Sequence, residues 1–151
     1  MIKKKNHTLV VNASVALKGI SLPQRLNLKL IELASFNQMN GIQIVNDLLQ
    51  NKDLWKAVLI DRPSWAGNPE YMNNAKTSEI INLIKLRDLS KGSWNVSTLY
   101  ILCYPDVDLR KKLYQLAQNW HADNVQWMDK QLASWQLGGG PDSDVLEVWW
   151  D

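Results

Sequence analysis

The chain has 151 residues, of which 46% are hydrophobic and 21% charged, and a formal net charge of +2 at pH 7. This length can bury a sizeable core, and the composition is that of a globular protein, which excludes a disordered chain. No apolar run approaches the roughly 18 residues of a membrane span, and the start MIKKKNHTLVV has too few apolar residues for a signal peptide. We therefore expect one cytoplasmic domain over residues 1–151, without membrane association.

The charges are distributed unevenly along the chain. Residues 1–104 carry 13 basic and 7 acidic residues, whereas residues 105–151 carry 4 basic and 8 acidic ones. Such a field could orient a charged partner or favour head-to-tail self-association, although solvated faces that happen to differ explain it more simply. Only Lys3, Lys4 and Lys5 cluster, so nucleic acid is not an expected partner.

The first segments with a clear periodicity of hydrophobic residues, near the N-terminus, predict a strand followed by a helix. Apolar residues alternate with more polar ones from Leu9 to Leu17, which predicts a strand at about residues 7–16, although a helix is compatible with ASVALKG. Ser21 and Gln24 have capping-box spacing, with Pro23 near the first helical position. In the helix that follows, one stripe and its flanks form the expected apolar face: Leu26, Leu30, Leu33 and Asn37, widened by Ile31, Ala34 and Phe36.

The middle of the chain predicts a second helix, a strand, a long loop and a third helix. Gly41 interrupts the first helix, and helical spacing then resumes up to about Lys52. The letters WKAVLID, residues 55–61, predict a buried strand. Residues 62–76 are rich in Pro, Gly and Asn and predict a loop, and residues 77–89 return to helical spacing.

The last third of the chain alternates between strand and helix patterns. STLYILCY, residues 97–104, is the most apolar run and has no alternation, which predicts a strand at the sheet centre. A helix opening at Asp106, a strand NVQWMD, a short helix KQLASWQL, a glycine-rich connection and a closing strand DVLEVWWD follow. We expect a single three-layer α/β domain, with a mostly parallel sheet of about five strands and helices on both faces. The short final connection allows the last strand to run antiparallel.

Two of the predicted strands end in an acidic residue. Asp61 follows VLI, and Asp106 follows YILCYP. If the strands are parallel neighbours, both carboxylates would face one crevice at the carboxyl edge of the sheet, with Arg62 adding positive charge. Paired carboxylates suit Mg²⁺ and phosphate-ester chemistry. The simpler alternative is that Asp106 caps the following helix and that Asp61 braces the long loop with Arg62.

Other chemistry-bearing residues match no defined site. His121, Asp123 and Asp129 do not have the spacing of a zinc site, and a histidine is favoured electrostatically at a helix C-terminus. Cys103 is the only cysteine and stands in an apolar run, which predicts a buried and unreactive thiol. Since neither a phosphate-binding glycine loop nor a nucleophile elbow occurs, we expect no cofactor.

The eight tryptophans are the most unusual feature of the composition. Most are expected in the core or at its boundary, since an indole buries a large area and keeps its N–H at a polar edge. Trp149 and Trp150 are consecutive in a predicted strand, so their side chains must point to opposite faces. Either both faces are covered, or one indole is exposed as an interface anchor.

The favoured function is binding rather than catalysis. The expected partner is another protein or a second copy of the chain, and the candidate contacts are Trp65, Tyr71, Trp135, Trp149 and Trp150. The alternative is a small metal-dependent enzyme or ligand-binding domain that uses Asp61, Arg62 and Asp106.

Overall fold

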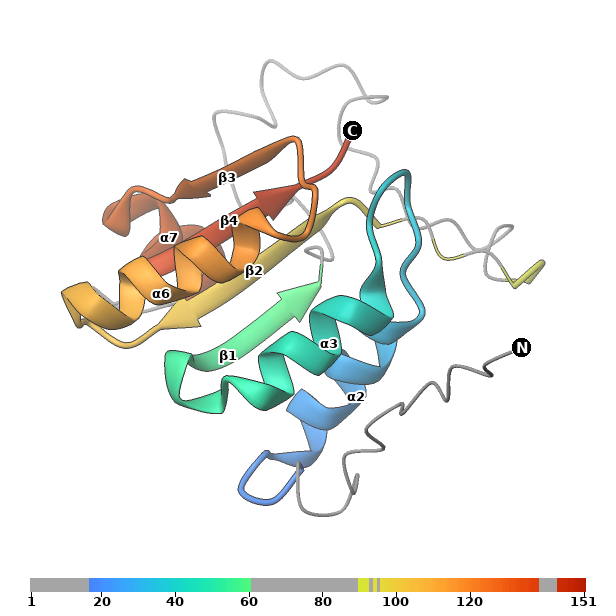
Figure 1. The fold of residues 1–151 in the computed structure, drawn as a ribbon, viewed down its shortest axis with the longest axis horizontal. Helices are drawn as coiled ribbons and strands as arrows, with labels where there is room; N and C mark the ends of the chain where they lie inside the picture. The colour runs from blue at the N-terminus through green and yellow to red at the C-terminus, as the bar shows by residue number, and fades with distance from the viewer. Residues whose placement is uncertain (1–16, 61–89, 93, 95, 139–143) are drawn as a thin grey trace, which may run out of the picture.

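The computed structural model describes residues 17–60, 90–92, 94, 96–138 and 144–151. These contain one four-stranded sheet in the order β1-β2-β4-β3, in which all neighbouring strands are antiparallel (Figure 1). The strands are β1 (Trp55–Ile60), β2 (Thr98–Cys103), β3 (Asn124–Trp127) and β4 (Asp144–Trp149). The helices are α2 (Leu22–Glu32), α3 (Gly41–Gln50), α6 (Val107–Gln118) and α7 (Lys130–Leu137), with a short 3₁₀ turn η1 (Lys52–Leu54) before β1.

The predicted direction of the strands in the sheet is wrong. In the part of the chain that the structure describes, the sheet has four strands that are antiparallel to their neighbours in place of mostly parallel ones, and the arrangement is not the expected three-layer sandwich of about five strands. β2 and β3 do run in the same direction and are joined by α6, as a crossover unit predicts. However, β4 lies between them and is antiparallel to both. The periodicity of hydrophobic residues shows where a strand lies in the sequence. It does not determine which strand pairs with it or whether the two run parallel or antiparallel.

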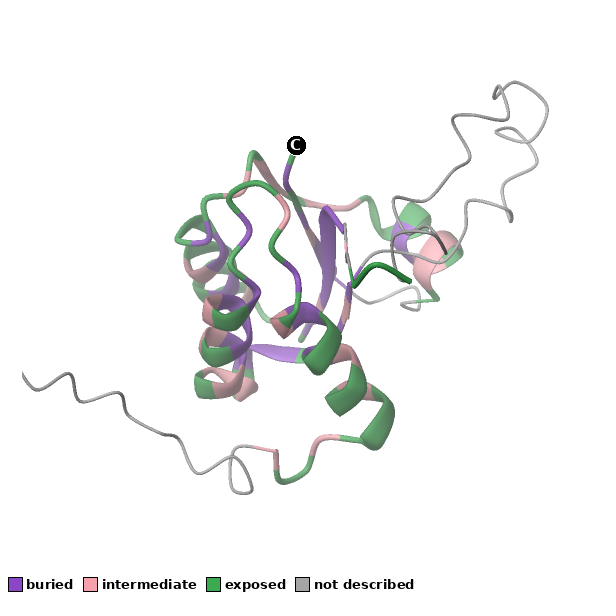
Figure 2. Ribbon diagram, turned by 90° about the vertical axis from the view of Figure 1, so that its right-hand side faces the viewer, coloured by how far each residue is buried: buried purple, intermediate pink, exposed green. Residues whose placement is uncertain are grey.

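The two faces of the sheet pack very differently. Figure 2 shows α3 and α6 on one side of the sheet and α7 on the other. Successive residues of β2 point to opposite faces, so that Leu99 and Ile101 enter the main core while Tyr100 and Leu102 enter a smaller cluster with Ala133 of α7. The largest fully buried side chains of the main core are Trp120, Trp150, Ile31, Ile44, Leu48, Leu99, Ile101, Leu113 and Leu146.

Most predicted elements within the described ranges form where the sequence placed them, but the first helix ends at Glu32 and does not continue through Phe36 and Asn37. α2 begins after Ser21, whose hydroxyl accepts a hydrogen bond from the Gln24 N–H at 3.4 Å. β2 pairs on both sides, which confirms its central position. The predicted strand at 7–16, the loop at 62–76 and the helix at 77–89 lie outside the described residues. No helix in the described part is long and apolar enough to cross a membrane.

Side chains of α2 occupy the outer edge of the sheet. On the side of β1 that faces away from β2, the Gln24 amide accepts from the Val58 N–H at 2.9 Å and donates to the Val58 carbonyl at 2.8 Å. One turn further along α2, the Asn27 carbonyl oxygen accepts from the Ile60 N–H at 3.0 Å. An uncovered edge strand is a template for pairing with other chains, so these two amides protect β1 from edge-to-edge association.

Replacing Gln24 with alanine is expected to lower the free energy of unfolding by about 1–3 kcal/mol, because two backbone groups of β1 lose their partner. Urea denaturation measures this loss, and light scattering of the native protein detects association through the opened edge. Gln43→Ala is the matched control, because Gln43 makes only one long, exposed side-chain bond, to the Asn119 carbonyl at 3.5 Å. Equal stability and equal scattering for the two variants would contradict the protective role.

Candidate functional site

The expected acidic crevice depends on parallel strands, and the strands it joins are antiparallel. Ile60, at the end of β1, pairs with Leu99, whereas Cys103, at the end of β2, pairs with Trp55. The carboxyl ends of β1 and β2 therefore lie at opposite ends of their shared ladder. Asp61 and Arg62 lie outside the described residues.

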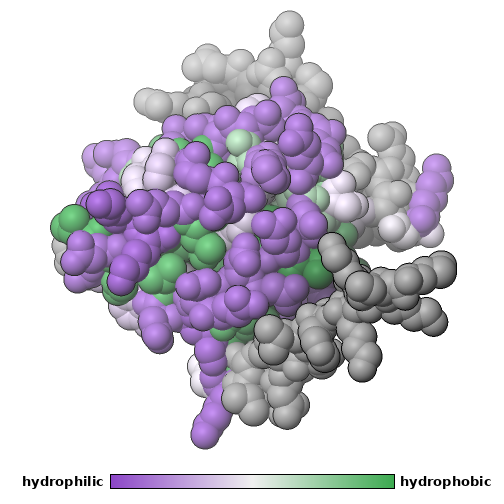
Figure 3. All heavy atoms as spheres, in the orientation of Figure 1, coloured by the Kyte–Doolittle hydropathy of each residue, from purple (hydrophilic) through white to green (hydrophobic). Residues whose placement is uncertain are grey.

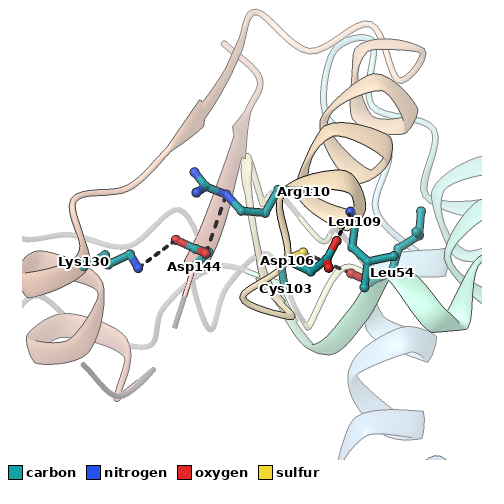
Figure 4. Close-up of polar contacts among 7 residues, drawn as sticks. All are labelled: Leu54, Cys103, Asp106, Leu109, Arg110, Lys130 and Asp144. Carbon is teal, nitrogen blue, oxygen red and sulfur yellow. Dashed lines mark hydrogen bonds and ion pairs between the residues drawn. The ribbon is translucent and has the colours of Figure 1, made fainter. Parts of the chain in front are cut away.

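Asp106 has a structural partner. Its carboxylate accepts a hydrogen bond from the Leu109 N–H at 2.9 Å and caps the N-terminus of α6 (Figure 4). Asp108 adds a second negative charge in the first turn, where the free N–H groups of the helix favour it. The side chain of Asp106 is exposed, and helix capping accounts for its place in the sequence.

A charge cluster that the sequence did not predict lies nearby, at the start of β4. The carboxylate of Asp144 is only 6% exposed and stands between two cations, the Arg110 Nε and the Lys130 Nζ, each 3.6 Å away. Figure 4 shows these side chains converging from α6, α7 and β4. The Arg110 guanidinium also lies over the Trp127 ring, 4.6 Å from its centroid.

The geometry of this cluster fits a structural role in holding α6, α7 and β4 together. Both ion pairs are longer than hydrogen bonds, and the buried Arg110 Nε makes no hydrogen bond. Its members come from positions 110, 130 and 144, so no local sequence pattern could have indicated the cluster. Among the described residues, no group of three or more His, Cys, Asp and Glu side chains could hold a metal ion.

Cys103 is buried, as predicted. Its thiol donates a hydrogen bond to the Leu54 carbonyl at 3.2 Å (Figure 4). Burial raises the pKa of the Cys103 thiol above its ordinary value of 9.0, and the neighbouring negative charge of Asp144 adds to this rise. The thiol therefore stays protonated at neutral pH, and its nucleophilic form is scarce.

Of the three residues compared with a zinc site, Asp123 and Asp129 have separate structural roles. His121 follows the end of α6 with a positive φ of 54°. The Asp123 carboxylate accepts from the Asp151 N–H at 2.9 Å, and that of Asp129 caps α7 by accepting from the Leu132 N–H at 3.0 Å.

The tryptophans divide into core and surface residues. Trp55, Trp120 and Trp150 are buried, and each indole N–H donates a hydrogen bond. Trp149 is 37% exposed, so one of the two consecutive indoles is buried and the other lies partly in solvent. Trp135, on α7, is 55% exposed. Of the predicted interface residues, Trp135 and Trp149 are thus on the surface and Trp150 is in the core, while Trp65 and Tyr71 lie outside the described ranges.

A row of exposed leucines runs along α2 and includes Leu33, the residue that follows the last residue of the helix. Leu22, Leu26 and Leu33 are 60–67% exposed and Leu30 is 39% exposed. At 3.6 residues per turn, these four side chains fall within an arc of about 80°. We call them the leucine stripe.

The leucine stripe lies on the side of α2 that faces away from the core. The buried side chains of the helix, Leu28 and Ile31, point to the opposite side, as does the Gln24 amide that bonds β1, whereas Asn27 lies on a flank. Periodicity had marked Leu26, Leu30 and Leu33 as members of the apolar face, but the structure leaves them in solvent. Elsewhere, Figure 3 shows mainly hydrophilic residues on the face that carries α3 and α6, with hydrophobic ones in smaller groups.

A cavity of about 240 Å³ lies between α7 and the sheet. Its lining is almost entirely apolar and consists of Ala57, Val58, Leu59, Tyr100, Leu102, Leu137, Gly138 and Val145. Apolar walls can hold a small hydrophobic group, and the described lining residues include no charged side chain to orient a polar ligand.

Comparisons of this chain with protein-family models, with curated proteins and with solved structures found no match.

Proposed function

We propose that the protein acts as a cytoplasmic binding module whose partner docks on the leucine stripe of α2. The observation that carries this proposal is the exposure of four leucines on one side of a helix whose opposite side is fully used by the core. Folded proteins rarely leave neighbouring apolar side chains exposed in a contiguous patch larger than a few hundred Å², and such patches mark interaction sites.

The physical driving force is the removal of apolar area from water. Burying a leucine stabilises a contact by about 1.5–3 kcal/mol when it was fully exposed beforehand. The leucines on α2 retain most of this potential, since three of the four are at least 60% exposed. An amphipathic helix that offers such a row is a recurring docking element in protein recognition.

The exposed tryptophans support the same class of function. Trp135 and Trp149 are large amphipathic side chains of the kind that anchor interfaces. They lie on α7 and β4, whereas the leucine stripe lies on α2. We therefore propose that Trp135 and Trp149 form contacts separate from the leucine stripe and contribute less to binding.

A photo-reactive phenylalanine analogue at position 26 tests the proposal. In cells that express the protein, we expect a cross-linked product from Leu26 and a strong reduction of that product when Leu30 and Leu33 are both changed to glutamine. Position 107 is the control, because Val107 is 79% exposed on α6 and is not part of the stripe. No product at position 26, or the same product from both positions, would refute docking on the stripe.

A further inference from the structure

We infer that the occupant of the leucine stripe is a second copy of this chain, with the two α2 helices packed antiparallel across a two-fold axis. This inference rests on the proposed function and names the partner of that same surface. A two-fold contact uses the same patch on both copies, so the patch must be complementary to itself.

The spacing of the leucines meets that requirement. In an antiparallel pair centred between Leu26 and Leu30, Leu22 of each copy lies opposite Leu33 of the other, and Leu26 lies opposite Leu30. All four leucines of both copies are then used. Their separations of four, four and three residues are those of a packing seam between two helices.

The charges beside the stripe favour the antiparallel direction. Arg25 and Glu32 lie on the same flank of the stripe. Along the helix axis, Arg25 is three residues before the point midway between Leu26 and Leu30, and Glu32 is four residues after it. Antiparallel packing brings Arg25 of each copy to within about one residue, or roughly 1.5 Å along the axis, of Glu32 in the other. Parallel packing about a two-fold axis would instead place the two flanks on opposite sides of the seam, so these opposite charges would not meet.

The neighbours of these charges are compatible with such a pair. Lys29 lies on the same flank and is joined to Glu32 at 2.6 Å, so Glu32 would be shared between Lys29 of its own copy and Arg25 of the other. The Arg25 Nε donates to the Ile20 carbonyl at 2.8 Å, and the other nitrogens of its guanidinium can bond across the interface.

The size of the patch sets the strength of the contact. A helix of 11 residues is about 16 Å long. One such helix offers less than the roughly 800 Å² per partner of a stable complex. We therefore expect a weak, reversible dimer that forms at high protein concentration.

Analytical ultracentrifugation of the full chain from about 10 to about 500 μM spans the range in which a small interface should dimerise. We expect the mass to rise from 17.3 kDa towards twice that value. The paired change Leu26→Gln and Leu33→Gln is expected to weaken dimerisation at least about tenfold. Val107→Gln, which alters an apolar residue that is outside the stripe and more exposed than Leu26 or Leu33, should leave dimerisation unchanged. Circular dichroism and urea denaturation verify that each variant is folded.

Two charge reversals test the direction of packing. In the Arg25→Glu variant two carboxylates face each other across the seam, and in the Glu32→Arg variant two guanidinium groups do, so each variant alone should dimerise less well than the original chain. An equimolar mixture restores two opposite-charge pairs in an antiparallel heterodimer and should recover dimerisation. A mixture no better than either variant alone would overturn the antiparallel arrangement.

The outcomes separate this inference from the proposed function. A mass that stays at 17.3 kDa at all concentrations, together with a cross-link from position 26 to a different protein, overturns the second copy and leaves docking on the stripe intact. A monomer without any cross-link from position 26 overturns both. A cross-linked product of two copies, together with dimerisation in the centrifuge that the paired change Leu26→Gln and Leu33→Gln abolishes, supports both.

Discussion

Replacing Gly41 with alanine is expected to lower the free energy of unfolding by about 3 kcal/mol or more. Gly41 is the first residue of α3, and its N–H donates to the Ala34 carbonyl at 3.1 Å. A Cβ at this position would overlap the Ile31 carbonyl oxygen and would lie 2.7 Å from that of Ala34. Both obstacles are backbone atoms, so relief requires α3 to move away from the end of α2. Urea denaturation followed by circular dichroism measures the loss.

Gly92→Ala is the matched control for this substitution. Gly92 has a positive φ of 75° and no atom within 4 Å of the site of a Cβ. Alanine there is expected to cost about 1–2 kcal/mol, because an L residue is disfavoured in that backbone conformation. If Gly41→Ala proved no more harmful than Gly92→Ala, the close approach of α2 and α3 would not be the reason for the glycine.

Replacing Trp120 with alanine is expected to lower the free energy of unfolding by about 3–5 kcal/mol. Trp120 is fully buried just beyond the end of α6. It connects that end of α6 with α3 and with Trp150, which follows β4. Its indole N–H donates to the Asp47 carboxylate on α3 at 2.8 Å, and its carbonyl accepts from the Trp150 indole at 3.2 Å. The truncation leaves a large cavity and removes the link to α3. Thermal and urea unfolding measure the effect.

Two further variants divide this loss into packing and hydrogen bonding. Trp120→Phe keeps much of the ring but leaves Asp47 without the indole donor, and about 1–3 kcal/mol is the expected cost. Trp135→Ala, on the surface of α7, should change stability by no more than about 0.5 kcal/mol. Comparable effects of Trp120→Ala and Trp135→Ala would show that Trp120 is not central to the core.

The faces of α2 illustrate what hydrophobic period can and cannot predict. The period and the Ser21 cap correctly predicted a helix. Apolar residues occur on both sides of it, however, so the period alone did not identify the buried side. In the structure Gln24 and Asn27 bond to β1, Leu28 and Ile31 are buried, and the leucine stripe faces outward.

The charge cluster around Asp144 is a second feature that sequence periodicity could not predict. The carboxylate of Asp144 gains its two cations only when β4 enters the sheet beside β2 and near the starts of α6 and α7. The expected pairing of Asp61 with Asp106 assumed that their two strands are parallel neighbours, and that assumption was wrong for a related reason. The alternation of strand and helix segments suggested parallel neighbours, whereas each hydrogen-bonded neighbour is antiparallel.

The sequence by itself determined which segments of the described part form strands and helices, apart from the end of the first helix, which is at Glu32 and not beyond Asn37. It also determined the caps at Ser21 and Asp106 and the burial of Cys103. These depend on neighbours a few residues away, through side-chain period and local hydrogen bonds. Only the tertiary structure decided the order and direction of the strands, the exposed side of α2 and the partners of Asp144. Those depend on contacts between distant residues, whose free energies arise only when the elements meet.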